Sequence, residues 1–241
     1  MYKTLRIASL SAALSLAAIT SASAQALATF GSAELAGFGE GSALLGGTLS
    51  TGHRGWGPIA TAIVQTYRYR SGPGTHTQAY AFSPSVGLQD MMAEGSVQAS
   101  VGYTFVSADA ANSLGGIVAG NETGGKNGVF ASAQGNYWGN GENTAQAIGS
   151  YNFASDYYWT RGRAAHRLAP SAHPVYVGAE LVLQGSQDFT PSIFRFQAGP
   201  TIEYRVSPEF RVGASAGYRG GNNNAPGSGY ARIEFLHLSR F

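Results

Sequence analysis

The residues of this chain that could do chemistry are arginines and glutamates that recur at every second position of long segments. Arg195, Glu203 and Arg205 alternate with apolar residues between 194 and 206, and Arg211 and Arg219 continue the pattern after a Ser-Pro-Glu turn. A period of two places one kind of side chain on one face of a β-strand. Guanidinium groups donate hydrogen bonds to sugar hydroxyls or anions and also pair with carboxylates. This polar face therefore predicts either a solute path or an internal ion-pair network.

The length of these segments indicates that they cross a membrane. A segment such as 194–206 is about twice as long as the usual strand of a soluble protein, and it suits the roughly 9–11 tilted residues of a transmembrane β-strand. Arginine facing lipid at mid-bilayer costs about 2–4 kcal/mol, so we expect the charged face to line the interior of a barrel. The candidate interior residues are Tyr157, Trp159, Arg161, Arg163, Arg167, Glu180, Arg195, Glu203, Arg205, Arg211, Arg219 and Glu234, and Arg68 and Arg70 show a similar pattern.

The fold class predicted from alternation and turn residues is all-β, a transmembrane antiparallel up-and-down barrel of about twelve strands. Ten strands remain the alternative, because glycine-rich sequence blurs the first two segments. Pro200 removes a backbone donor and predicts a bulge. The expected strands are 28–38, 41–50, 58–70, 76–88, 94–106, 127–138, 142–154, 156–168, 173–185, 192–205, 209–219 and 229–241.

Loop lengths predict which end of the barrel faces the cell exterior. Outer-membrane barrels have short periplasmic turns, longer external loops and periplasmic termini. The long connections 107–126 and 220–228 would then be external, and the short turns 139–141 and 206–208 periplasmic. Tyrosines near strand ends, namely Tyr67, Tyr69, Tyr103, Tyr137, Tyr151 and Tyr204, predict the aromatic girdles of such barrels.

The N-terminus predicts export. Lys3 and Arg6 precede an apolar run and a small-residue Ala22-Ser23-Ala24 site, which is typical of a signal peptide over residues 1–24. Residues 25–241 would then form a single outer-membrane β-barrel domain. At the other end, the terminal aromatic Phe241 resembles the signal read by the barrel assembly machinery, which makes that machinery an expected partner.

Composition excludes several classes of protein. The chain has 15 basic and 13 acidic residues, and loss of the two basic leader residues would leave a neutral mature chain. Nucleic-acid binding needs a concentrated basic surface, so no nucleic acid is expected as a partner. The sequence contains no cysteine, which excludes a disulfide scaffold.

No motif predicts catalysis, a cofactor or a metal. Residues 213–217 match the G-x-S-x-G pattern of a nucleophile elbow, but that motif requires a strand-to-helix turn and here it lies within an alternating strand. The histidines are scattered and show no Ser/His/acid spacing or metal-ligand spacing. The sequence therefore predicts a protein that is not an enzyme and uses no cofactor.

One stretch resembles a known family. Residues 156–163 read Asp-Tyr-Tyr-Trp-Thr-Arg-Gly-Arg and follow Ser150-Tyr151. The other segments of the resemblance are Val177–Glu180, Gln184-Gly185, Arg195–Gly199 and Val212–Tyr218. From Ser150 to about Tyr218 the chain resembles the alphaproteobacterial cellulose biosynthesis protein BcsS family. This resemblance implies an outer-membrane barrel associated with cellulose synthase operons, and it implies no catalytic residues.

Together these observations predict a non-enzymatic accessory of cellulose or exopolysaccharide biosynthesis or secretion in the bacterial outer membrane, with a role in biofilm. Its expected partners are outer-membrane lipid and a cellulose synthase or secretion complex, or the polysaccharide itself. The alternatives are a general porin-like diffusion channel and, third in order, a barrel hydrolase of lipid or glycan.

Overall fold

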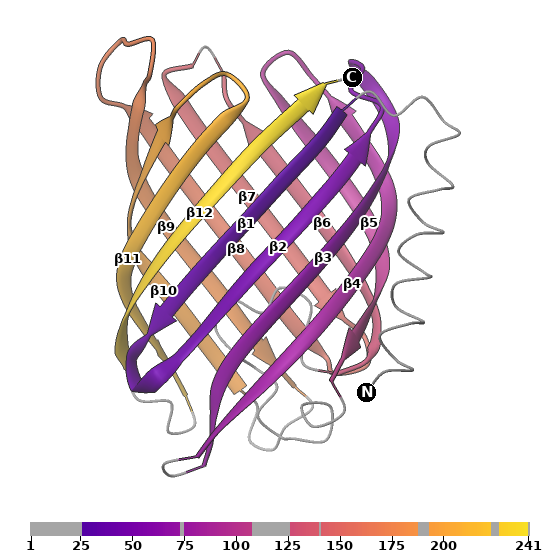
Figure 1. Ribbon diagram of the computed structural model, residues 1–241, viewed down its shortest axis with the longest axis vertical. Helices are drawn as coiled ribbons and strands as arrows, with labels where there is room; N and C mark the ends of the chain where they lie inside the picture. Colours follow the sequence, from indigo (N-terminus) through magenta and orange to yellow (C-terminus); the bar gives the residue numbers. More distant parts are fainter. Residues whose placement is uncertain are drawn as a thin grey trace.

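A closed barrel of twelve antiparallel strands makes up the computed structural model (Figure 1). The structure describes residues 26–72, 75–107, 126–139, 141–187, 193–222 and 227–240, so the predicted signal peptide, Phe241 and most of the 107–126 connection lie outside the described residues. The strands are β1 (Ala26–Ala36), β2 (Glu40–Ser50), β3 (Gly55–Gly72), β4 (Thr75–Met91), β5 (Gly95–Val106), β6 (Gly128–Tyr137), β7 (Asn143–Asn152), β8 (Tyr157–Arg167), β9 (Val175–Ser186), β10 (Ile193–Arg205), β11 (Phe210–Gly221) and β12 (Ser228–Arg240).

The predicted strand count of twelve is confirmed, and the ten-strand alternative is wrong. β1 and β2 pair from Ala26↔Ser50 to Ala36↔Glu40, joined by a short 3₁₀ turn, η1 (Gly37–Gly39). β1 also pairs with β12 along its whole length, which closes the sheet. None of the helices in the described part of the chain is long and apolar enough to cross a membrane.

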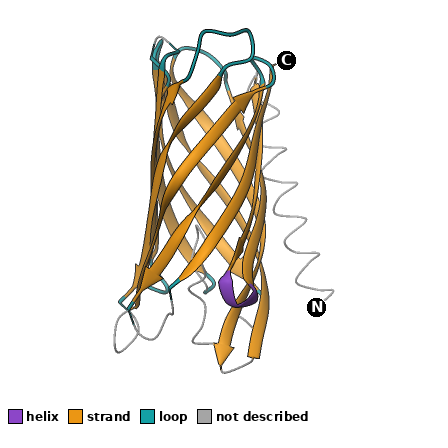
Figure 2. Ribbon diagram, turned by 90° about the vertical axis from the view of Figure 1, so that its left-hand side faces the viewer, coloured by secondary structure: helices purple, strands orange, loops and turns teal. Residues whose placement is uncertain are grey.

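The two ends of the barrel differ in the way that loop lengths predict. β1 begins and β12 ends at the same rim, which also carries the turns after β6 and β10. The opposite rim carries η1, and β5, β9 and β11 end there (Figure 2). We call these the terminal rim and the loop rim.

The outer face carries the apolar side chains. On β10, Phe194, Ile202 and Tyr204 are exposed, whereas the intervening Gln197 and Glu203 are buried. The exposed aromatic residues Tyr103, Tyr137, Tyr151 and Tyr204 lie near strand ends, as a girdle requires. The side chain of Tyr67 instead points inward and is only 1% exposed, so its predicted place in the girdle is wrong.

The predicted inward orientation of Arg68 is also wrong. Arg68 is exposed and shares its face of β3 with Val64, which is 57% exposed. Its partner on β2 is Gly41, and β3 continues past this point without a partner on β2. Arg68 therefore lies at the loop rim, where an outward guanidinium avoids the middle of the membrane. The Arg70 side chain lies outside the described residues.

The bulge predicted at Pro200 is absent. Pro200 faces Ala179 of β9, and the register between β10 and β11 is the same at Ala198↔Tyr218 and Thr201↔Ser215, on either side of the proline. A Cβ on the neighbouring Gly199 would lie 2.1 Å from the carbonyl oxygen of Ala216. The glycine thus allows β10 and β11 to approach closely beside the proline, so no extra residue has to be inserted.

The orientation of the outer face generates a stability prediction. Val101 lies near the middle of β5 and is 51% exposed. Val101→Arg is expected to lower the free energy of unfolding by about 2–4 kcal/mol, because a guanidinium would face lipid near mid-bilayer. Denaturant titration of the protein folded into lipid vesicles measures this loss, with Val101→Leu as the size-matched apolar control. Unchanged stability of the arginine variant would contradict the assignment of this face to lipid.

Candidate functional site

The interior of the barrel has two chemically different walls. The charged wall comprises the buried and half-buried Arg and Glu on the inner faces of β8–β12, β1 and β2. The neutral wall comprises the inner faces of β3–β7, whose described residues carry no charge and include hydroxyl and amide side chains. The charged wall contains Glu34, Glu40, Arg161, Arg163, Arg167, Glu180, Arg195, Glu203, Arg205, Arg211, Arg219, Arg232 and Glu234.

Arg232 lies at the centre of the charged wall. Its Nη2 donates to Glu34 Oε2 at 2.6 Å and to Gln197 Oε1 at 2.8 Å, and its Nη1 donates to Glu180 Oε1 at 3.1 Å. Tyr230 donates its hydroxyl to the same Glu180 oxygen at 3.0 Å. The Arg232 side chain is only 4% exposed. Two carboxylates, Glu34 on β1 and Glu180 on β9, neutralise the charge of this desolvated guanidinium.

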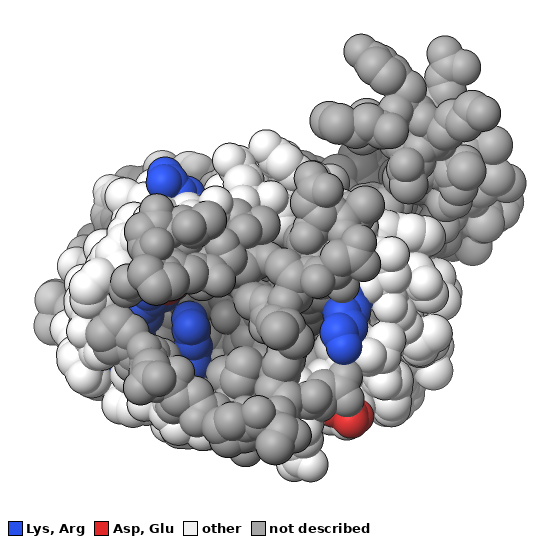
Figure 3. All heavy atoms as spheres, turned by 90° about the horizontal axis from the view of Figure 1, so that it is seen from below, with Lys and Arg blue, Asp and Glu red and all other residues white. Residues whose placement is uncertain are grey.

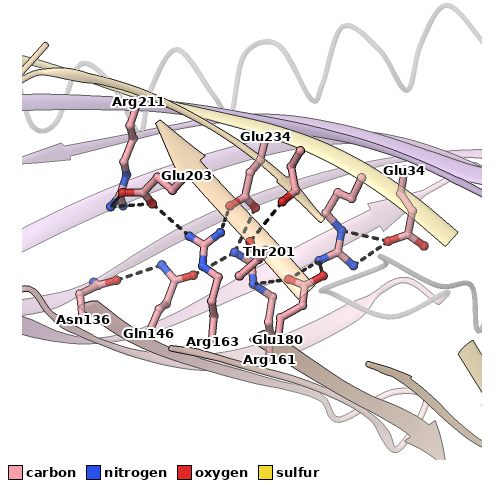
Figure 4. Close-up of polar contacts among 12 residues, drawn as sticks. Glu34, Asn136, Gln146, Arg161, Arg163, Glu180, Thr201, Glu203, Arg211 and Glu234 are labelled. Carbon is pink, nitrogen blue, oxygen red and sulfur yellow. Dashed lines mark hydrogen bonds and ion pairs between the residues drawn. The ribbon is translucent and has the colours of Figure 1, made fainter. Parts of the chain in front are cut away.

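A second group of ion pairs lies toward the terminal rim (Figure 4). Arg161 Nη2 contacts Glu234 Oε2 at 3.0 Å, and its Nε lies 3.8 Å from Glu180, which links this group to Arg232. Arg163 pairs with Glu234 and lies 3.6 Å from Glu203. β8 and β12 are four strands apart, so these arginines reach across the interior. Glu203 also contacts Arg205 at 3.3 Å and Arg211 at 3.4 Å.

A third group lies toward the loop rim and centres on Glu40. Its carboxylate pairs with Arg219 and lies 3.7 Å from Arg195 Nη1. Arg219 Nε donates to Ser228 Oγ at 2.9 Å. Glu40 is the first residue of β2, whereas Arg195 lies on β10 and Arg219 on β11. Their contacts with Glu40 therefore span β12 and β1.

The neutral wall is held by hydrogen bonds between side chains of adjacent strands. Ser100 and Ser132 hydroxyls lie 2.8 Å apart, and Gln98 Nε2 donates to Gln134 Oε1 at 3.2 Å. Gln146 on β7 joins the two walls, since Arg161 donates to its Oε1 at 3.0 Å. Such hydroxyl and amide groups can exchange hydrogen bonds with water or with a polar solute.

Most of the interior residues expected from the sequence are brought into this network. Tyr157 donates to Gln184 Oε1 at 2.9 Å, and Arg205 additionally stacks 4.4 Å above the ring of Tyr176. Trp159 is buried at 1% exposure, without a charged partner among the described contacts. Arg167, half-buried near the terminal rim, takes no part in the described ion pairs.

Sequence reasoning missed Glu34, Glu40 and Arg232. Arg232 could have been found, because it lies two residues before Glu234 on the same face of an alternating strand. The two glutamates lie in glycine- and alanine-rich segments with weak periodicity.

The structure gives no support to a nucleophile elbow. Ser215 lies within β11, opposite Thr201 of β10 and Arg232 of β12, with regular strand on both sides. In the residues that the structure describes, no group of three or more His, Cys, Asp or Glu could hold a metal ion.

Comparison with known proteins identifies the fold. No family profile and no curated protein matches the sequence. Among solved structures, the COG4313 outer membrane channel from Pseudomonas putida F1 is similar at a TM-score of 0.54 and 9% identity, over 90% of this chain and 96% of that one. The β domain of the Bordetella autotransporter BrkA is similar at 0.53 and 14% identity, over 90% and 100%. The KdgM porin in complex with disordered oligogalacturonate is similar at 0.50 and 9% identity, over 87% and 98%.

At these identities the likeness defines a fold, that of bacterial outer-membrane β-barrels. The closed sheet and its apolar outer face agree with it, and they place the protein in the outer membrane.

The central ion pairs generate a second prediction. Arg232→Met is expected to lower the free energy of unfolding by about 3–5 kcal/mol, because it leaves two buried carboxylates without their cation. Adding Glu34→Gln and Glu180→Gln to that variant should restore much of the loss. Arg211→Met is the matched control: its side chain is 31% exposed, and a loss of no more than about 1 kcal/mol is expected. Equal losses for the two arginine variants, measured by denaturant titration, would contradict a special role for Arg232.

Proposed function

We propose that this protein is a non-enzymatic outer-membrane channel for small polar solutes. The observation that carries the proposal is the uncharged stretch of hydroxyl and amide side chains on the inner faces of β5 and β6, which faces an ion-paired wall across the interior. The inner faces of β3–β5 also carry an apolar cluster of Tyr67, Ala79, Ala81 and Val106. A barrel that served only as a structural anchor could fill its interior with apolar side chains. Hydroxyl and amide groups along a wall instead replace the hydration of a passing solute.

The charged wall makes the proposed channel narrow and selective. Arg161 and Arg163 reach Glu234 from four strands away, so the ion pairs occupy part of the cross-section. Eight arginines and five glutamates among the described residues give this wall a formal excess of three positive charges. That balance favours anions over cations.

The similar solved structures are consistent with a channel but do not distinguish it from other functions of the same fold. One is called a porin and another an outer membrane channel, but the third is an autotransporter domain, so the same fold serves several functions. The chemistry of the interior therefore carries the argument.

Planar-bilayer recording tests the channel. The purified protein is expected to give small currents with chloride favoured over potassium in the reversal potential. Arg205→Gln combined with Arg211→Gln should lower the chloride-to-potassium permeability ratio roughly twofold, because it removes two positive charges from the terminal-rim group. Arg68→Gln, on the outer face, is the control and should leave the ratio unchanged. Absence of current from heat-modifiable, folded protein would overturn the proposal.

A second candidate function is an accessory role in cellulose or exopolysaccharide secretion. It is favoured by the position of the residues that resemble the BcsS family: Ser150 to Tyr218 build most of β8–β11, which carry much of the charged wall. The part of the chain with the resemblance is thus also the part with the most distinctive interior chemistry.

Deletion of the gene in a cellulose-producing host tests this role. Secreted glucan and biofilm mass are expected to fall, and complementation with the wild-type gene should restore both. Complementation with Arg161→Gln/Arg163→Gln should restore less than the wild type. Unchanged glucan yield, fibre form and biofilm in the deletion strain would rule the role out.

A further inference from the structure

Four buried hydrogen-bond donors, for which the described residues provide no acceptor, lie on neighbouring strands near the loop rim. Trp159, Gln184 and Arg195 face the interior from β8, β9 and β10, and the register places them side by side: Trp159 is opposite Gln184, and Gln184 is opposite Arg195. Arg219 comes from β11 and shares the Glu40 carboxylate with Arg195. We call these four residues the donor cluster.

Each member of the donor cluster has a buried N–H group for which the described residues provide no hydrogen-bond acceptor. These groups are Trp159 Nε1, Gln184 Nε2, Arg195 Nε and Arg219 Nη1. Trp159 and Gln184 are both only 1% exposed. The carbonyl oxygen of Gln184 is already occupied, since it accepts the Tyr157 hydroxyl at 2.9 Å, so its amide presents only the donor.

The chemistry of the cluster defines what it would bind. Buried donors normally have acceptors, and a structure that leaves several unpaired at one place calls for an acceptor from outside the chain. A water molecule would satisfy individual donors, but the described residues of the cluster also bring two guanidinium groups to one carboxylate, Glu40. Among these described residues one positive charge is left over, and an anion with several acceptor oxygens balances both the charge and the donors.

We propose that the donor cluster binds the carboxylate of a small anionic solute, such as a sugar acid, at the loop rim. Trp159 and Gln184 donate to the carboxylate oxygens as neutral groups, and Arg195 and Arg219 supply the charge. The proposal rests on the proposed channel for the route that the solute takes after binding. The Arg195 side chain is 22% exposed, which opens the cluster toward the interior. Viewed from the loop rim, several basic side chains are visible at this end of the molecule (Figure 3).

Equilibrium binding to the folded protein in detergent tests the proposal without requiring transport. The chain has three tryptophans, so Trp56→Phe/Trp138→Phe leaves Trp159 as the sole fluorescent reporter. Titration with glucuronate is expected to give a saturable change in Trp159 emission, whereas glucose, which lacks the carboxylate, should give none. Gln184→Met and Arg195→Gln, each in that background, should weaken glucuronate binding about tenfold or more.

The control variant is Arg68→Gln, which removes an arginine from the same rim but from the outer face, and its affinity should equal that of the reporter protein. Heat-modifiable migration in detergent gels shows that each variant is folded. Equal responses to glucuronate and glucose, or no response to either by folded protein, would overturn the proposal. Binding by a protein that conducts no current would support this site and overturn only the channel. Conduction without binding would overturn only the site.

Discussion

The pairing of β1 with β12 is the constraint on which the rest of this molecule depends. In hydrocarbon no water can satisfy a free backbone N–H or C=O, so a sheet that spans the membrane has to close. Closure pairs Ala26 with Arg240 and Ala36 with Tyr230, the two ends of an uninterrupted ladder. Every side chain then faces either lipid or the interior. The arginines and glutamates of the long strands have only the interior available, because the alternative costs several kcal/mol for each charge.

Closure also decides which charges meet. Glu34 and Arg232 are separated by almost the whole chain, yet β1 and β12 are neighbours, and the two side chains lie 2.6 Å apart. Gln197 and Glu180 reach the same place from β10 and β9. Buried charges are tolerated because the carboxylates at the core of the network have multiple partners, as Glu180 does with Arg161 and Arg232. The network is therefore a consequence of the closed topology as much as of composition.

The sequence predicts which face of a strand a residue occupies better than it predicts which residues contact one another across the interior. Along β10 the polar and apolar residues separate cleanly, so its inward and outward sides could be read without a structure. Along β3 they do not: Ile59, Ala60 and Val64 are apolar on both faces. A one-residue error in assigning such a strand exchanges its two faces, which explains why Tyr67 and Arg68 were interchanged. Periodicity also contains no information about contacts across the interior, so the roles of Glu34 and Glu40 required the three-dimensional structure.

The separation of the interior into two walls suggests how selectivity could arise without a moving part. Glu203 contacts three arginines and Glu40 two, so swinging one arginine away would leave a desolvated carboxylate with fewer partners. Opening a gate built from such side chains would therefore cost considerable free energy. The neutral wall has no comparable restraint, because its hydroxyl and amide groups can exchange one hydrogen bond for another with water or solute. In the proposed channel, passage along the neutral wall, within the fixed field of the charged wall, would require no rearrangement of the ion pairs. The donor cluster departs from this arrangement at the loop rim, where unpaired N–H groups replace satisfied ones, and it is there that an incoming anion would gain most from binding.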